Sequence, residues 1–124
     1  MAENLRNSGL KVDRIAGVVL GSVPLAAALA LETGIPYVMI RKEKKDHGTG
    51  KLIEGDLQSG DKVLVVEDVI TSAGSSINAI EVLRKEGAVV ENVYSVIDRE
   101  AGGSDNLKAI GVTLTPLVKA SELL

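Results

Sequence analysis

Short aliphatic runs alternate with helical patterns from one end of the chain to the other. The runs that we expect to form strands are 15–20, 37–40, 62–66, 89–97 and 112–114, and the expected helices are 25–32, 75–85 and 105–110. We also expect one short helix within 1–12 and another within 117–124. This alternation predicts an α/β fold with right-handed crossovers and a doubly wound, mainly parallel sheet of about five strands.

The composition agrees with such a sheet. The 124 residues suffice for one domain, 1–124, and include two Tyr but neither Phe nor Trp, so the core must be aliphatic. Aliphatic and β-branched packing suits a parallel sheet that helices cover on both faces. The scarcity of aromatic rings argues against a nucleic-acid partner bound by base stacking. The absence of Cys excludes disulfides and thiolate metal sites.

Residues 1–9 contain no apolar run of the kind found in signal peptides. The longest apolar stretch, 15–31, is interrupted by Gly17, Gly21, Ser22 and Pro24, which favours a strand, a turn and a helix over a membrane span. We therefore expect a cytoplasmic protein without a membrane partner. The net charge of −3 says little about partners, but the positive charge is concentrated between Arg41 and Lys45.

The residues after the strand 62–66 are the most informative part of the sequence. Two acids, Glu67 and Asp68, come first, and a turn rich in hydroxyl groups and glycine then leads into a helix. Backbone N–H groups at a helix start favour a phosphate, and the acids would suit the paired hydroxyls of a ribose. Hydroxyl donors come from Thr71, Ser72, Ser75 and Ser76, while Ala73 and Gly74 keep the turn small. In parallel sheets such a ligand lies beyond the carboxyl ends of the strands, here at Leu20, Ile40 or Val66.

The same residues have a simpler explanation. Ser and Thr are common helix caps, and acids at a strand end are often only solvated. That explanation is preferable for a serine pair alone. The combination of strand, acid pair and complete turn favours a binding site instead.

This block resembles the phosphoribosyl pyrophosphate (PRPP) motif of type I phosphoribosyltransferases, and no Walker A or Rossmann fingerprint occurs. The resemblance implies that Glu67 and Asp68 hold the ribose hydroxyls. It also implies a cradle for the 5′-phosphate, formed by Thr71, Ser72, Ala73, Gly74 and Ser75. The family often has Gly where this chain has Ala73, a departure that should cost little.

Residues 41–60 are charged and lack clear periodicity, which predicts a long, flexible, exposed loop with some hairpin character around Leu52. A basic cluster such as 41–50 is commonly just solvated. Beside a phosphoribosyl site, its cations could neutralise a leaving pyrophosphate, and Gly48 and Gly50 could allow the loop to close over the site. The candidate cations are Arg41, Lys42, Lys45 and His47.

The order of residues in this loop resembles the catalytic loop of orotate phosphoribosyltransferases. Residues 20–26 resemble their pyrophosphate loop, with Gly21 and Ser22 as candidate contacts, and 95–99 resemble the later strand end. The resemblance implies that Lys45, His47 and Arg41 reach the pyrophosphate across a homodimer interface and that Lys42 acts within its own subunit. Arg99 would bind the orotate carboxylate; an ion pair with Asp98 or Glu100 is nearly as well supported.

The resemblance thus implies an enzyme of pyrimidine biosynthesis that makes orotidine 5′-monophosphate and pyrophosphate from orotate and PRPP. Mg²⁺ would arrive on the pyrophosphate of PRPP, and the sequence suggests no dedicated metal site. The alternatives are a PRPP- or nucleotide-binding module with weak or no catalysis, and a phosphoribosyltransferase for another base. A flavodoxin-like or receiver domain is less favoured because of the acids Glu67 and Asp68.

Two departures from the family bear on activity. Its members usually begin with several dozen more residues, which form a hood over the base, and this chain is expected to lack most of that hood. Ser22 stands where the pyrophosphate loop commonly has Gly, so we expect its Cβ to resist the backbone conformation of that loop. Both departures suggest a truncated, engineered or reduced form of the enzyme.

Overall fold

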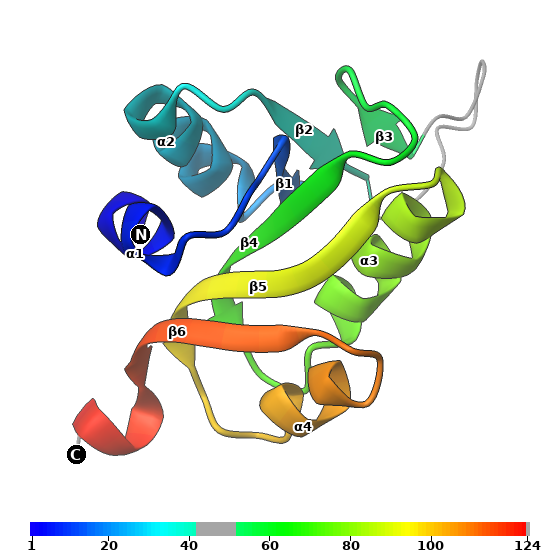
Figure 1. Cartoon of the computed structure of the whole chain (residues 1–124). Helices are drawn as coiled ribbons and strands as arrows, with labels where there is room; N and C mark the ends of the chain where they lie inside the picture. The colour runs from blue at the N-terminus through cyan, green and yellow to red at the C-terminus, as the bar shows by residue number, and fades with distance from the viewer. Residues whose placement is uncertain (42–51, 124) are drawn as a thin grey trace.

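The computed structural model describes residues 1–41 and 52–123. Within them a six-stranded sheet has the order β3-β2-β1-β4-β5-β6, and every neighbouring pair is parallel except β2 with β3 (Figure 1). The strands are β1 Arg14–Val18, β2 Tyr37–Ile40, β3 Ile53–Glu54, β4 Lys62–Ile70, β5 Val89–Asp98 and β6 Thr113–Lys119. The helices are α1 Ala2–Ser8, α2 Val23–Thr33, α3 Gly74–Lys85, α4 Gly103–Lys108 and the 3-10 helix η1 Ala120–Leu123. The predicted α/β class with a mainly parallel sheet is confirmed.

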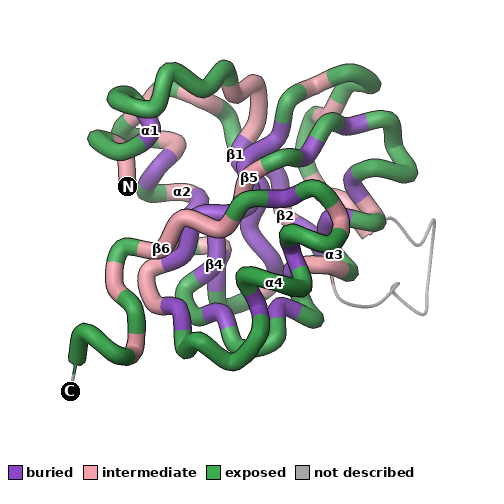
Figure 2. The backbone as a smooth tube through the Cα atoms, turned by 60° about the horizontal axis from the view of Figure 1, so that its bottom comes forward, coloured by how far each residue is buried: buried purple, intermediate pink, exposed green. Residues whose placement is uncertain are grey.

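The sheet separates two apolar layers. One layer, on the side of α1 and α2, contains Leu5, Ile15, Leu29 and Val66. The other, on the side of α3 and α4, contains residues such as Val65, Ile80, Leu83, Val93 and Leu107. Figure 2 shows the buried positions along the strands between these helices. The fully buried side chains of largest volume are Ile, Leu and Val, as the composition predicted.

Several predicted boundaries differ from the structure, two of them by four residues or more. The strand expected to end at residue 66 continues to Ile70, because Val69 and Ile70 pair with Ile97 and Asp98 of β5. The segment 117–124 does not form the expected helix in its first part, since β6 runs to Lys119 and only the 3-10 turn η1 follows. Pro116 is tolerated in β6 because this strand is at the edge of the sheet.

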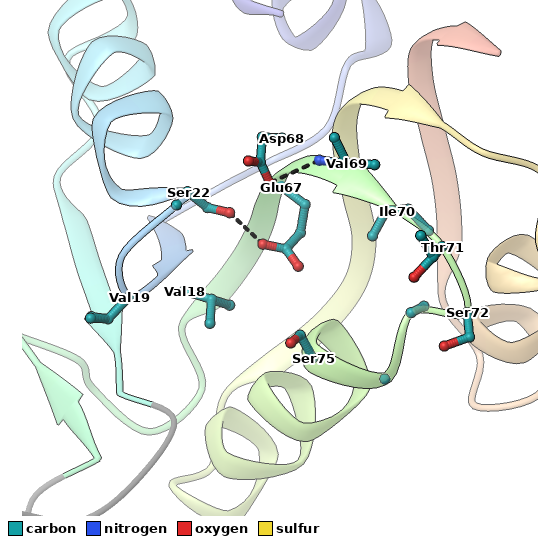
Figure 3. Close-up of a pocket in the computed structure, with 13 residues that line it drawn as sticks. Val18, Val19, Ser22, Glu67, Asp68, Val69, Ile70, Thr71, Ser72 and Ser75 are labelled. Atoms are coloured by element: carbon teal, nitrogen blue, oxygen red, sulfur yellow. Dashed lines mark hydrogen bonds between the residues drawn. The ribbon is translucent and has the colours of Figure 1, made fainter. Parts of the chain in front are cut away.

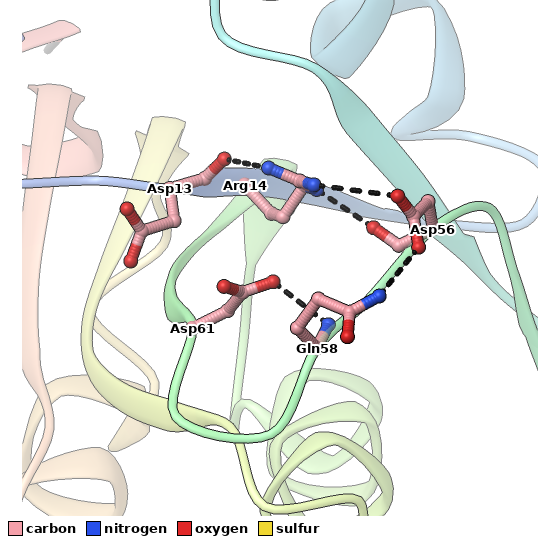
Figure 4. Close-up of polar contacts among 5 residues, drawn as sticks. All are labelled: Asp13, Arg14, Asp56, Gln58 and Asp61. Carbon is pink, nitrogen blue, oxygen red and sulfur yellow. Dashed lines mark hydrogen bonds and ion pairs between the residues drawn. The ribbon is translucent and has the colours of Figure 1, made fainter.

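A polar network fastens the connection between β3 and β4 to the start of β1 (Figure 4). The guanidinium of Arg14 donates from Nε to the backbone oxygen of Asp56 at 2.7 Å, and its Nη2 lies 3.6 Å from the Asp56 carboxylate. Gln58 donates from its backbone N to Asp61 at 2.8 Å and from its side chain to Asp56 at 2.9 Å. This network lies at the amino ends of β1 and β4, away from the carboxyl ends of these strands.

In the described part of the chain, no helix is both long and apolar enough to cross a bilayer.

Candidate active site

A cavity of about 370 Å³ lies at the carboxyl ends of the adjacent strands β1 and β4 (Figure 3). From β1 the chain continues to β2 on one side, whereas β4 continues to β5 on the other, so the cavity lies where the strand order reverses. Ligands bind at such switch points in doubly wound sheets. Its lining consists of Val18, Val19, Gly21, Ser22 and the continuous segment 67–75. Two of the three predicted strand ends, those near Leu20 and Val66, therefore meet in one site.

Glu67 is buried, with 6% of its surface exposed, although it lines the cavity. Its carboxylate accepts hydrogen bonds from the hydroxyls of Ser22, in the turn after β1, and of Ser76, in the first turn of α3. The second of these bonds is 2.8 Å long. Burying a carboxylate is unfavourable unless hydrogen bonds replace its water, which the two serines do. The predicted phosphate donor Ser76 is thus directed at Glu67.

Asp68 differs from its neighbour because it is exposed. Its Oδ1 accepts a hydrogen bond from the backbone N–H of Val69 at 2.8 Å. The turn after β1 passes close to its other oxygen: a Cβ added to Gly21 would lie 3.4 Å from Asp68 Oδ2. Asp68 therefore presents a solvated carboxylate between the two walls of the cavity.

The turn 71–75 includes the first two residues of α3, which begins at Gly74. The first helical hydrogen bond runs from Ile77 N to Ala73 O at 2.8 Å, and no side chain caps the helix start. The backbone N–H groups of residues 73–76 accordingly precede the first helical donor, and such groups bind anions well. Thr71, Ser72 and Ser75 are exposed and line the same cavity.

Ala73 has a left-handed backbone conformation, with φ 72° and ψ 19°. Glycine adopts this conformation without the steric cost that a Cβ brings. The Ala73 methyl group is nevertheless buried, with 4% exposure, against the core under α3 and α4.

The turn between β1 and α2 forms the second wall. Ser22 is the residue immediately before α2, and its φ of −94° and ψ of −4° are an ordinary right-handed conformation, so the expected resistance of its Cβ is not found. The close packing falls on Gly17 instead: an added Cβ there would lie 2.8 Å from Ser22 O and 2.9 Å from the Ala26 Cβ. Gly17 thus allows this turn to approach β1.

The two predicted arginines lie outside the cavity lining. Arg41 donates from Nε and Nη2 to Glu54 Oε1 at 2.9 and 2.6 Å, which ties the end of β2 to β3. Arg99 is exposed, its backbone N–H donates to Ile70 O at 2.9 Å, and within the described chain it forms no ion pair with Asp98 or Glu100. The other predicted loop residues, Lys42, Lys45 and His47, lie outside the described residues.

Two residues of α4 that were not predicted from the sequence contact the turn 71–75. The side chain of Asn106 donates to the backbone oxygen of Ser72 at 2.8 Å. Gly103 is packed so closely that an added Cβ would lie 2.6 Å from Thr71 O. Neither residue belongs to a motif, and Asn106 is 34 positions from Ser72, so no local signal could have indicated the contact.

Comparisons with a family model and with curated proteins indicate the same family. Residues 1–117 match the model of the phosphoribosyl transferase domain. The orotate phosphoribosyltransferase of Pyrococcus abyssi is 50% identical over 121 residues, which cover 98% of this chain and 66% of that protein. The enzyme of the same name from Methanothermobacter thermautotrophicus is 48% identical over 122 residues, covering 98% and 68%. The chain thus spans about two thirds of the length of these curated relatives.

Similar solved structures belong to the same family. The orotate phosphoribosyltransferase of Aeropyrum pernix superposes with a TM-score of 0.84 at 37% identity, covering 92% of this chain and 64% of that one. The Mycobacterium tuberculosis orotate phosphoribosyltransferase in complex with PRPP superposes with a TM-score of 0.82 at 27% identity, covering 98% and 71%.

Proposed function

Because the chain belongs to the phosphoribosyltransferase family, and within it to the orotate phosphoribosyltransferases, we propose that it transfers the 5-phosphoribosyl group of PRPP to orotate. In this reaction the bond between the anomeric carbon and the pyrophosphate oxygen breaks, and its electron pair leaves with pyrophosphate. A bond forms between the same carbon and a ring nitrogen of orotate, which has lost its proton. The products are orotidine 5′-monophosphate and pyrophosphate.

The observation that carries this proposal is the cavity between the two helix starts. At one wall, the amides of residues 73–76 and the hydroxyls of Thr71, Ser72 and Ser75 would bind the 5′-phosphate. At the other wall, the turn with Gly21 and Ser22 would face the pyrophosphate. A ligand with a phosphate at each end of a sugar matches this arrangement.

The two acids would then have different tasks. Asp68 is exposed in the cavity and would accept hydrogen bonds from the ribose hydroxyls. The Glu67 carboxylate already accepts from Ser22 and Ser76, so in this conformation it connects the two walls. We therefore assign the main sugar contact to Asp68, and a ribose contact by Glu67 would need these bonds to rearrange.

Mg²⁺ would enter on the pyrophosphate oxygens of PRPP, where it would neutralise charge on the leaving group. Asp68 is the exposed carboxylate of the cavity, the hard oxygen type of donor that Mg²⁺ prefers. Lys42 would assist the same leaving group from its own subunit. Lys45, His47 and Arg41 would reach it across a homodimer interface, Arg41 after release from Glu54, and Arg99 would bind the orotate carboxylate. The homodimer and the cytoplasmic location remain predictions.

Calorimetry with PRPP and Mg²⁺ tests the binding half of the proposal. We expect binding by the wild type and at least a tenfold loss, on the order of 1.4 kcal/mol, in Asp68→Asn, which removes the charged acceptor. Asp105→Asn is the matched control, because Asp105 is exposed on α4 and does not line the cavity. An unchanged affinity in Asp68→Asn would contradict the assignment.

The absorbance of orotate tests the chemical half. Orotate should disappear when PRPP and Mg²⁺ are present, and Lys45→Ala should slow this reaction while sparing PRPP binding. PRPP binding without orotate consumption would support the binding-module alternative. Consumption of another base in place of orotate would reassign the specificity.

A further inference from the structure

We propose that Asn106 is a positioning residue that holds the phosphate turn, residues 71–75, from the side opposite the ligand. This inference rests on the proposed function, because it concerns the turn assigned to the 5′-phosphate. Asn106 lies on α4, outside the cavity lining, and its Nδ2 donates to the backbone oxygen of Ser72 at 2.8 Å. It therefore contacts the turn without being placed to contact the phosphate.

The geometry of the peptide unit between Ser72 and Ala73 explains what the hydrogen bond from Asn106 does. Among the described residues only the Val19–Leu20 peptide bond is cis, so the peptide bond between Ser72 and Ala73 is trans. In a trans peptide the C=O and the following N–H point in opposite directions. A bond that holds the Ser72 oxygen toward α4 therefore directs the Ala73 N–H away from α4. Ala73 lines the cavity, so this N–H is one of the donors offered to a phosphate.

The backbone conformation of Ala73 explains why the turn needs such a restraint. Ala73 has φ 72°, a region in which a residue with a Cβ is strained. Such a conformation persists only where the surrounding structure fixes it. The Asn106 bond acts on the peptide unit immediately before Ala73, so it is well placed to maintain this conformation when no ligand is bound.

Gly103 supports the same part of the turn. A Cβ at this position would clash with the Ile70 side chain and would lie 2.6 Å from Thr71 O. The start of α4 thus lies in direct contact with the chain as it leaves β4. Together Gly103 and Asn106 form a support from α4 that reaches both Thr71 and Ser72.

The test compares two ligands that use different walls of the cavity. Asn106→Leu keeps the approximate shape of the side chain but removes the donor. We expect its affinity for ribose 5-phosphate, measured by calorimetry, to fall about tenfold, the effect of one misplaced donor on a charged ligand. Its affinity for pyrophosphate with Mg²⁺ should stay within about twofold, because the turn after β1 is untouched. The KM for PRPP should rise likewise, with little change in kcat.

Asn7→Leu is the matched control, since Asn7 is exposed on α1 at the other face of the sheet. It should leave both affinities unchanged. Asn106→Asp is a second test variant, because its carboxylate cannot donate a hydrogen bond to Ser72 O. Its affinity for ribose 5-phosphate should fall at least as much as that of Asn106→Leu. If Asn106→Leu does not fold, Asn106→Ala makes the same comparison.

The outcomes separate this inference from the proposed function. A wild type that binds neither PRPP nor ribose 5-phosphate overturns the proposed function, and the inference with it. A wild type that binds both, with an Asn106→Leu variant of equal affinity, overturns the inference alone. A parallel loss of ribose 5-phosphate and pyrophosphate also overturns it, because a general loss of structure, rather than a local one, would then explain the result.

Discussion

Ser22 and Glu67 are 45 positions apart in the chain, yet the hydroxyl of Ser22 donates to the buried carboxylate of Glu67. The same carboxylate accepts from Ser76 in α3. One side chain of β4 therefore connects the turn that begins α2 with the first turn of α3. In this conformation the two hydrogen bonds join the two walls of the cavity.

Ser22→Ala should lower the free energy of unfolding by about 1.5–3 kcal/mol, because it removes a donor to a buried charged group. Urea denaturation measures this loss as a lower midpoint with an unchanged slope. Ser75→Ala is the control: Ser75 is exposed, and its variant should stay within about 0.5 kcal/mol of the wild type. Equal midpoints for the two variants would show that the Ser22 bond contributes nothing to stability.

Gly17→Ala should destabilise the fold by about 1–3 kcal/mol, because the new Cβ would press on Ser22 O and the Ala26 Cβ. The displaced turn should also bind pyrophosphate more weakly. Gly74→Ala makes the matched comparison, since a Cβ there meets its nearest atom, Ser72 Oγ, at 3.9 Å. Thermal unfolding of both variants checks the prediction, and a Gly17→Ala variant as stable as Gly74→Ala would refute it.

Ala73→Gly and Ala73→Val should differ strongly. Glycine accepts φ 72° freely, but it loses a buried methyl group and gains entropy in the unfolded chain, so its stability should stay within about 1 kcal/mol of the wild type. The β-branched valine should lose about 2 kcal/mol or more in this conformation. Urea midpoints decide the matter, and a valine variant as stable as the glycine variant would mean that residue 73 is not left-handed.

Glu100 should titrate below its ordinary value. Hydrogen bonds from the side chain and the backbone N–H of Ser121 lower the pKa of Glu100 from 4.5, and Lys119 adds to this effect. A lowered pKa in the folded state stabilises the fold above pH 4.5, and this contribution is lost as the pH falls through the lower folded value. An NMR titration of the Glu100 carboxyl carbon should give a midpoint below 4.5, moving upward in Ser121→Ala. A wild-type midpoint at or above 4.5 would contradict the Ser121 contacts.

Local pattern was enough to locate most of the sheet. The strand 37–40 was predicted with the bounds that the structure gives, because an aliphatic run between Pro36 and Arg41 leaves few alternatives. The local pattern was insufficient where pairing with a neighbouring strand decides how far a strand extends. The acids Glu67 and Asp68 suggested a strand end, but the long strand β5 keeps β4 extended past them.

The candidate site was predicted to a similar extent. The turn 71–75 could be proposed from the sequence because its residues are consecutive and their chemistry is specific, and in the structure it lines the cavity. The engagement of Glu67 with Ser22 and Ser76, and the support of Ser72 by Asn106, join residues that only the folded chain brings together. Hydroxyl and amide side chains are too common in turns and helices for their sequence positions to reveal such partners.

The two walls of the cavity belong to strands that are neighbours in the sheet but are separated along the chain by α2, β2 and β3. A molecule that touches both walls would therefore act as a clamp across the middle of the sheet. Since both walls are together only in the native state, a higher concentration of such a ligand should raise the melting temperature, and the stabilising free energy should grow with the logarithm of that concentration once it exceeds the Kd.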